Sequence, residues 1–400
     1  PYLIAIAIGD IAFRALGAHT GVYAEPAMLE RAAYEFADTE RMLQAAEALY
    51  GAYRWGRYDI MVLPPSFPYG GMENPTLTFA TPTVLAGDRS LVSLIAHELA
   101  HSWSGNLVTN ATWDDFWLNE SFTTYIEGRI VEALFGREEA DMGYVLAWAD
   151  IQKALVEEPA SSTVLTAHFD NPDDPVGAIV YEKGAALLRL IETEVGRVRF
   201  DAYLRSYFER HAFQPITTTA FLADIRAHLV RGDSALEQRL QLDAWTGLPG
   251  LPSNAIAPRS DALDRVDAAA AAFAGGGSLS DAPWPSWGTL QRQRFLRRLP
   301  TLSPAQLSAL EQELSLNESG NSEILFDWLS IAVRHRYQPA IPALERFLLA
   351  QGRWKFVFPL YRELMRQDEW GAPIARRIYA HARPMYHSVS QTAIDAVITD

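Results

Sequence analysis

The pattern of apolar and polar positions predicts a mixed N-terminal part and a helical remainder. Alternating or continuous apolar runs at residues 2–9, 58–63 and 76–80 predict strands. Apolar residues at helical spacing from 26 to 50 predict a helix with Pro26 in its first turn. Residues 93–103 predict a second, buried helix, and a third is expected from about residue 115.

The rest of the chain shows mostly helical spacing, with interruptions that predict loops. Residues 170–175 contain two prolines among aspartates and predict a loop before a helix. Three prolines between residues 247 and 258 predict a linker, and Gly275 to Gly277 end an alanine-rich helix. Short amphipathic segments then predict stacked helical hairpins, at residues 292–299, 304–314, 322–334, 341–350, 357–366 and 371–382.

Composition narrows the class of protein. The chain of 400 residues is 49% hydrophobic and 21% charged, which is typical of a globular protein with a sizeable core. The formal net charge of −15 argues against a surface that binds nucleic acid. The acidic residues could attract cationic substrates, or they could simply form a solvated surface. No run of 18 apolar residues is present, so we expect no membrane span. With no cysteine, only imidazole and carboxylate groups remain as ligands for zinc.

The helix at residues 93–103 carries the pattern His97-Glu98-x-x-His101. A spacing of four residues places both imidazoles on one helix face, where they can bind one metal ion. Glu98 lies beside that face and could accept a proton from a metal-bound water. The alternative is a set of satisfied core polar residues with no metal.

A catalytic zinc site needs a third protein ligand and one open position. Glu120, separated from His101 by 18 residues, lies in the next predicted helix and is the candidate. Two turns further on the same helix face is Glu127, which could accept a hydrogen bond from a ligating imidazole. The alternative for Glu127 is a surface carboxylate.

These motifs together resemble the gluzincin aminopeptidases, in the leukotriene A(4) hydrolase and aminopeptidase B branch. The resemblance rests on His97 to His101, on Asn119-Glu120, and on an upstream segment that matches the exopeptidase motif of the family, Gly70-Gly71-Met72-Glu73-Asn74-Pro75. It implies an α+β thermolysin-like zinc metallopeptidase domain followed by an all-α, solenoid-like helical domain. It also implies one Zn²⁺ per chain and short peptides as substrates.

The resemblance assigns roles to further residues. Tyr181 corresponds to the tyrosine that stabilises the transition state, although a buried structural tyrosine is the alternative. Gly70, Gly71, Met72 and Glu73 correspond to the substrate-binding motif, in which Glu73 would pair with the substrate ammonium or otherwise be a plain loop carboxylate. Arg353 and Lys355 correspond to cations that hold a substrate carboxylate; a solvated basic helix start is their alternative. Asp173 corresponds to an aspartate that faces the first side chain of the substrate.

We therefore expect a zinc aminopeptidase in which Glu98 is the general base. Two other functions stay open: epoxide hydrolysis of the leukotriene type, and non-catalytic peptide binding. Val176 stands where the leukotriene enzymes carry a second tyrosine, which favours peptidase chemistry.

The expected domain organisation is a remnant of a β domain at 1–20, a catalytic domain at 21–246, a linker at 247–260 and a helical domain at 261–400. Because relatives carry a β-rich domain before this point, we expect that a missing N-terminal domain completes the cleft. The expected location is the cytoplasm.

Overall fold

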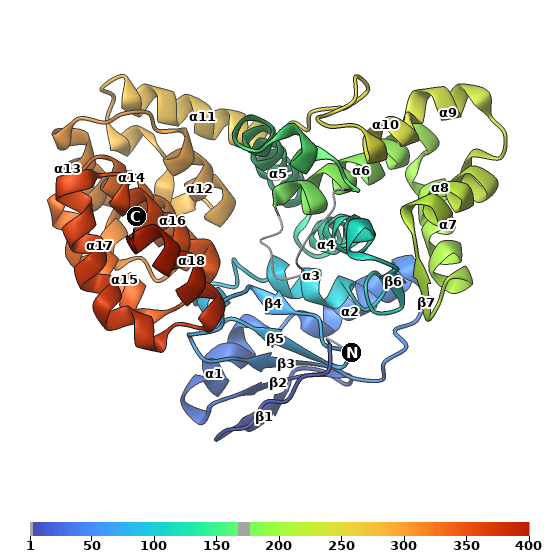
Figure 1. Ribbon diagram of the computed structural model, residues 1–400, viewed down its shortest axis with the longest axis horizontal. Coiled ribbons are helices and arrows are strands. Elements are labelled where there is room, and N and C mark those ends of the chain that lie inside the picture. The colour runs from blue at the N-terminus through green and yellow to red at the C-terminus, as the bar shows by residue number, and fades with distance from the viewer. Residues whose placement is uncertain (1–2, 167–176, 400) are drawn as a thin grey trace.

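The computed structural model describes residues 3–166 and 177–399. Asp173 and Val176 lie outside the described residues. Figure 1 shows a sheet and a group of helices around it, coloured blue to yellow, beside a stack of helices in orange and red. The stack is the C-terminal helical domain, and its helices α11 (Asp261–Ala274) and α12 (Thr289–Arg298) contact α5 (Arg137–Glu157) of the first group.

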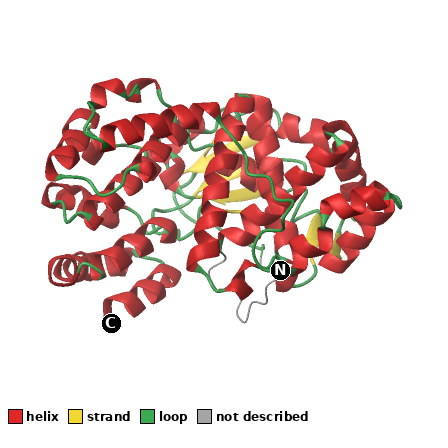
Figure 2. Cartoon of the chain, turned by 90° about the horizontal axis from the view of Figure 1, so that it is seen from above, coloured by secondary structure: helices red, strands yellow, loops and turns green. Residues whose placement is uncertain are grey.

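The N-terminal part is built on a sheet whose described strands number five, in the order β1-β2-β3-β5-β4. Its central strands β2 (Thr20–Ala24), β3 (Tyr58–Val62) and β5 (Leu77–Ala80) are parallel, and β1 (Ala12–Ala15) and β4 (Gly71–Met72) pair antiparallel at the two edges. Figure 2 shows the sheet in yellow with helices around it. The strands predicted near residues 58–63 and 76–80 are therefore confirmed, and the Gly-rich motif lies on an edge strand.

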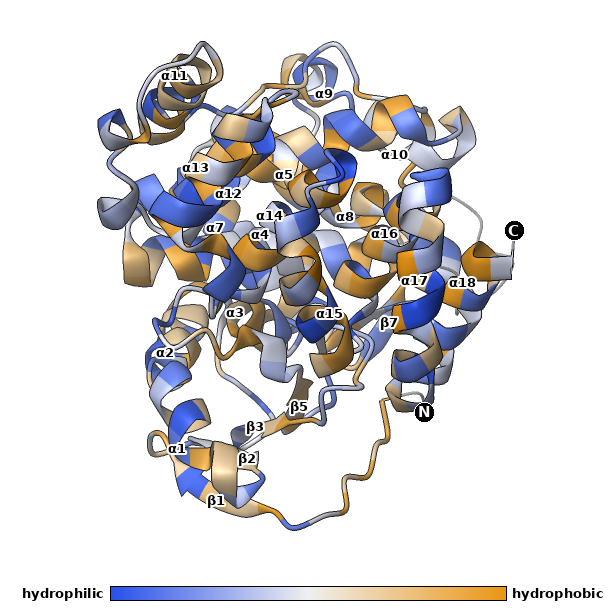
Figure 3. Ribbon diagram, turned by 90° about the vertical axis from the view of Figure 1, so that its left-hand side faces the viewer, coloured by the Kyte–Doolittle hydropathy of each residue, from blue (hydrophilic) through white to orange (hydrophobic). Residues whose placement is uncertain are grey.

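Two expectations about the first part of the chain are wrong. Residues 3–10 form no strand; Ile4, Ile6 and Ile8 are exposed, and Figure 3 shows this segment as an extended trace leading to β1. The alternating pattern could not produce a strand here because no described strand pairs with it. The single helix expected from 26 to 50 is two helices, α1 (Pro26–Glu35) and α2 (Thr39–Tyr50). The chain turns between them, where the Thr39 hydroxyl donates to the carbonyl of Phe36 at 2.7 Å.

Helices then cover the sheet and form the rest of the N-terminal part. The two that carry the predicted metal ligands, α3 (Ser93–Ala100) and α4 (Trp117–Phe135), pack against each other. A short second sheet pairs β6 (Val108–Asn110) with β7 (Gln214–Ile216). The remaining helices of this part are α6 (Gly184–Val195), α7 (Arg197–Arg210), α8 (Thr218–Ile225), α9 (Ser234–Leu240) and α10 (Leu242–Gly247).

The helical hairpins predicted for the C-terminal part are confirmed, several to within a few residues. The helices are α11 (Asp261–Ala274), α12 (Thr289–Arg298), α13 (Pro304–Leu314), α14 (Ser322–Arg334), α15 (Ile341–Ala350), α16 (Trp354–Met365), α17 (Asp368–Ala382) and α18 (Ser388–Thr399). The last of these was not predicted. It packs against α16 through residues that include the buried Ile394.

Each part has its own hydrophobic core. The first core joins sheet and helices from Val22 to Trp245, and the second joins α11 to α18 with two residues of α5, Met142 and Leu146. Main-chain hydrogen bonds also cross between the parts: Gly352 N–H donates to the Pro65 carbonyl and Trp354 N–H to the Pro68 carbonyl, each at 2.8 Å. The helical domain is thereby fixed to the loop that leads into β4.

None of the described helices is long and apolar enough to span a membrane.

Candidate metal centre and active site

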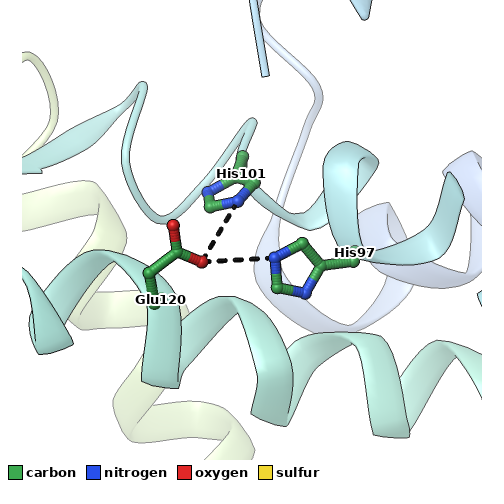
Figure 4. A group of neighbouring side chains, drawn as sticks. All are labelled: His97, His101 and Glu120. Carbon is green, nitrogen blue, oxygen red and sulfur yellow. Dashed lines mark hydrogen bonds and ion pairs between the residues drawn. The ribbon is translucent and has the colours of Figure 1, made fainter. Parts of the chain in front are cut away.

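Helices α3 and α4 bring the three predicted metal ligands together. Figure 4 shows His97 on helix α3, His101 in the turn directly after that helix, and Glu120 on the facing helix, with the three side chains pointing toward one another. The Nε2 atoms of His97 and His101 lie 3.2 Å and 3.6 Å from the same oxygen, Oε2 of Glu120. The helical spacing of four residues stacks the imidazoles on one face, with their ring centroids 4.8 Å apart.

The other nitrogen of each imidazole is held by the protein. Nδ1 of His97 lies 3.1 Å from Oε2 of Glu127, and Nδ1 of His101 lies 3.1 Å from the carbonyl oxygen of Ser104. The Thr123 hydroxyl lies 3.1 Å from the same Nδ1 of His101. With a proton on each Nδ1, both Nε2 lone pairs face the carboxylate of Glu120.

This donor set suits zinc. Two imidazole nitrogens and one carboxylate oxygen, all within 4.8 Å of one another, form the two-histidine, one-glutamate set found in catalytic zinc sites. Glu127 meets an imidazole nitrogen of His97, as the helical spacing predicted, and would fix its tautomer if His97 binds a metal.

The electrostatics of Glu120 and His97 favour a positive charge between the two side chains, here a proton that a metal ion would replace. Burial alone would raise the pKa of Glu120, but His101 and His97 outweigh it and hold that pKa below its ordinary value. Burial lowers the pKa of His97, whereas its hydrogen bonds to Glu120 and Glu127 raise it well above the ordinary value. The buried carboxylate is therefore ionised and strongly attracts positive charge.

Glu98 lies beside the ligands, at the edge strand β4. Its side chain is 5% exposed, and a Cβ atom on Gly71 would overlap its carboxylate. Gly71 is therefore required for the strand to approach so closely. Burial raises the pKa of Glu98 well above its ordinary value; His97 opposes this shift, and Glu73, Glu120 and Glu127 add to it.

Tyr181 reaches the site from a π-helical turn, Ile179–Lys183, that leads into α6. Its ring centroid lies 6.1 Å from that of His97. The Ser121 hydroxyl, next to the ligand Glu120, donates to the Val180 carbonyl at 2.5 Å and ties this turn to α4. Burial raises the pKa of Tyr181 well above its ordinary value, and the charges of Glu120, Glu73 and Glu98 raise it further. The phenol therefore stays protonated and can donate a hydrogen bond.

Glu73 is buried, 7% exposed, and converges on the same site. Its carboxylate, that of Glu98 and a ring nitrogen of His101 lie within 4.8 Å of one another. This second group shares His101 with the first, and we assign the metal to the first because only that set contains two imidazoles. Glu73 is thus placed next to the base and the metal ligands, where a substrate ammonium could pair with it.

The structure also brings Arg353 of the helical domain to the catalytic domain. Its guanidinium donates to Thr83 Oγ1 at 3.2 Å, and Nη2 lies 2.8 Å from the position that a Cβ on Gly70 would take. Burial lowers the pKa of Arg353, and the charges of Glu323 and Glu98 oppose this. Lys355 is half exposed and is held by Glu323, with Nζ 2.7 Å and 2.9 Å from its two carboxylate oxygens.

Comparison with known proteins identifies the family. Residues 34–241 match the Peptidase family M1 domain, and residues 287–398 match the domain described as Leukotriene A4 hydrolase, C-terminal. The chain belongs to peptidase family M1. Within this family it has the M1 catalytic domain and the helical C-terminal domain of the leukotriene A4 hydrolase type, so the predicted fold class is confirmed.

Curated M1 relatives align along almost the whole chain. Leucine aminopeptidase 2 of Yarrowia lipolytica is 35% identical over 98% of this chain and 64% of its own length. Leukotriene A-4 hydrolase of Xenopus laevis is 38% identical over 91% of this chain and 62% of its own length. This M1 chain thus spans less than two thirds of the length of either relative.

A solved structure shows the same fold. Yeast LTA4 hydrolase in complex with bestatin superposes with a TM-score of 0.88 at 31% identity, covering 98% of this chain and 67% of the other. The matched domain confirms the expected peptidase family, for which zinc is the implied metal.

Sequence reasoning missed the residues that hold the predicted groups in place. They include Ser104 and Thr123 at His101, Ser121 at the Tyr181 turn, Asn106 at Glu73 and Glu323 between Arg353 and Lys355. Thr123 lies three residues after Glu120 and could have been found by helical spacing. Ser104 acts through its main-chain carbonyl, and the others act between elements far apart in the chain, so local spacing carries no signal for them.

Proposed function

We propose that this chain is a zinc-dependent aminopeptidase that removes N-terminal residues from short peptides. The observation that carries the proposal is the convergence of Glu73 and Glu98 on His101, within 4.8 Å. A carboxylate beside the base and a metal ligand would bind the free α-ammonium one residue away from the reacting carbonyl. The family membership and the names of the aminopeptidase relatives support the same reaction.

The proposed ligands are His97, His101 and Glu120, with one ion per chain. When bound, Zn²⁺ supplies a Lewis acid that makes water more acidic and polarises the scissile carbonyl. Glu98 accepts the proton of the attacking water and returns it to the leaving amine. Its raised pKa suits both transfers, because a carboxyl group titrating nearer neutrality can accept and release a proton.

Tyr181 would stabilise the oxyanion. Its phenol is kept protonated by burial and by three nearby carboxylates, so it can donate a hydrogen bond where negative charge develops. The partly exposed Gly71 and Met72 of edge strand β4 would align an extended peptide by main-chain hydrogen bonds.

We place the far end of a short substrate at the helical domain. The Arg353 fork would receive the terminal carboxylate close to Gly70, with Lys355 adding a second cation. Asp173 stays a proposed contact for the first side chain. An N-terminal domain outside this sequence is proposed to complete the cleft.

Peptidase chemistry is the function we propose in preference to epoxide hydrolysis. Val176 supplies no hydroxyl, whereas Glu73, Glu98 and Tyr181 form a set suited to peptides with free amino ends. A non-catalytic binding protein would have no need of a buried Glu98 carboxylate beside His101 and Glu73.

A panel of aminoacyl arylamides tests the proposal. The purified protein should contain about one zinc per chain and should release arylamine from several aminoacyl substrates. Activity should vanish on treatment with a chelator and return with added zinc. Activity that survives complete removal of zinc would contradict the proposed function.

A further inference from the structure

The loop after the metal-binding helix makes a contact with the substrate motif that the proposed reaction does not yet use. After α3 the chain turns at Gly105, which has a φ of +108°. Its N–H donates to the Val108 carbonyl at 2.8 Å, and Oδ1 of Asn119 would lie 2.5 Å from a Cβ at this position. Glycine is required here both by the left-handed backbone and by this close approach.

The turn presents Asn106 to both the metal helix and the substrate motif. The main-chain N–H of Asn106 donates to the carbonyl of the ligand His101 at 3.0 Å. Its side-chain Nδ2 donates to the carbonyl of Glu73 at 2.9 Å. One residue thus connects a metal ligand to the glutamate of the exopeptidase motif.

Glu73 depends on such a contact because it lies just beyond the sheet. The ladder between β4 and β5 pairs Gly71 with Ala80 and Met72 with Phe79, and it ends before Glu73. The chain then turns, with Leu77 N–H donating to the Asn74 carbonyl at 3.1 Å and Thr76 at a φ of +72°. The carbonyl of Glu73 accepts its hydrogen bond from Asn106, a side chain of another element.

We propose that Asn106 is a positioning residue for ammonium recognition: through its bond to the Glu73 carbonyl it fixes the Glu73 carboxylate relative to the metal ligands. The inference rests on the proposed function, in which Glu73 pairs with the substrate α-ammonium. Asn106 itself touches neither the ammonium nor the scissile bond. It sets the distance between the ammonium site and the reacting carbonyl.

Binding of two matched inhibitors tests this role in the zinc-loaded protein. L-Leucine hydroxamate carries a free α-amine, and 4-methylpentanoyl hydroxamate is the same molecule without it. Asn106→Ala should weaken leucine hydroxamate about tenfold by calorimetry, the effect of one hydrogen bond, and leave the desamino compound unchanged. Zinc content and melting temperature should stay close to those of the parent protein.

Glu73→Gln completes the design. If Asn106 acts through Glu73, adding Asn106→Ala to Glu73→Gln should weaken leucine hydroxamate no further. Asn110→Ala is the matched control. The Asn110 side chain donates to the carbonyl of Thr112 at 2.9 Å, and Thr112 is not a residue of the proposed site. It should leave both inhibitors unchanged.

The outcomes separate the inference from the proposed function. Two results overturn the positioning role and leave the proposed function standing. In the first, Glu73→Gln weakens leucine hydroxamate but Asn106→Ala does not. In the second, Asn106→Ala weakens both inhibitors equally. Additive effects in the double variant overturn it as well. If Glu73→Gln has no effect, the proposed ammonium site fails and the inference with it. Asn106→Leu, which is nearly isosteric and lacks the donor, replaces Asn106→Ala if that variant does not fold.

Discussion

At the residue scale, the surroundings of Glu98 favour a carboxyl group that exchanges protons. The side chain is buried between β4 and the metal ligands, and three further carboxylates act on it. Burial and like charges both disfavour the ionised form, and a bound dication acts in the opposite direction. The balance between them is what would allow Glu98 to accept a proton and then return it.

Replacing Glu98 by glutamine tests its role as a base. Glu98→Gln should retain zinc, because Glu98 is not one of the three proposed ligands. Turnover should fall about 10²–10⁴-fold. Zinc analysis and steady-state kinetics on an aminoacyl arylamide measure the two quantities. Turnover close to that of the parent protein, with zinc content unchanged, would remove Glu98 from the mechanism.

At the scale of elements, the close approach of strand β4 to helix α3 shapes the site. A methyl group on Gly71 would overlap the Glu98 carboxylate, so either the strand or the base would have to move. Gly71→Ala should therefore lower kcat/KM at least about tenfold, since misplacement by about an ångström is costly in catalysis. Zinc occupancy should not change.

Gly143→Ala is the control for that variant. Gly143 lies in helix α5, where a Cβ meets no atom within 4 Å and the φ value is ordinary. The same chemical change should leave kcat/KM unaltered and stabilise the fold by about 0.5–1 kcal/mol. Equal kinetics for Gly71→Ala and the parent protein would show that β4 does not constrain the base.

A buried lysine, Lys183, ties the π-helical turn that carries Tyr181 to neighbouring loops. Lys183 donates from Nζ to the carbonyls of Thr163 and Leu248, at 2.8 Å and 2.9 Å. Burial lowers its pKa from 10.5 to about 8. Between these two pH values the unfolded chain binds a proton that the folded chain does not, so this group makes the free energy of unfolding rise with pH.

Lys183→Met isolates this contribution. The unfolding free energy of the parent protein minus that of Lys183→Met should increase from pH 8 to pH 10.5, by at most about 3 kcal/mol. Urea denaturation at a series of pH values measures the difference and cancels titrations common to both proteins. A difference that is constant or falls over this range would contradict the lowered pKa.

Local periodicity explains how much of these elements could be predicted from the sequence. The spacing within each pair, His97 with His101 and Glu120 with Glu127, is a local helical property. It therefore predicted which side chains share a face and which carboxylate meets an imidazole. The break between α1 and α2 and the irregular segment at residues 3–10 depend on tertiary pairing, which periodicity does not encode. The role of Asn106 depends on a turn that brings a side chain to another element.

At the scale of the whole molecule, the helical domain brings a buried arginine to the proposed substrate-binding motif. The main-chain bonds of Gly352 and Trp354 to the loop at residues 65–68 place Arg353 against Gly70 and Thr83. Glu323, 7% exposed, lies 3.7 Å from Arg353 and pairs with Lys355, so it orders both cations. Domain docking therefore decides where a substrate carboxylate would bind.

Arg353→Gln tests this contribution of the helical domain. The KM for a tripeptide with a free carboxylate should rise about tenfold, as expected for loss of a charged hydrogen bond, while aminoacyl arylamides are unaffected. Arg362→Gln is the control, because Arg362 is exposed on helix α16 and stacks on Phe358. Equal changes for both substrates would indicate a loss of structure and not of carboxylate recognition.

The central claim is that the site removes N-terminal residues by recognising a free α-ammonium. The direct measurement is mass spectrometry of the products from one short peptide and its N-acetylated counterpart, each incubated with the zinc-loaded protein. We predict stepwise loss of the first residue from the free peptide and no cleavage of the acetylated one, because an acetylated end offers no ammonium to the buried Glu73 carboxylate. Internal cleavage of the acetylated peptide that a chelator abolishes would contradict the account even with the zinc chemistry intact.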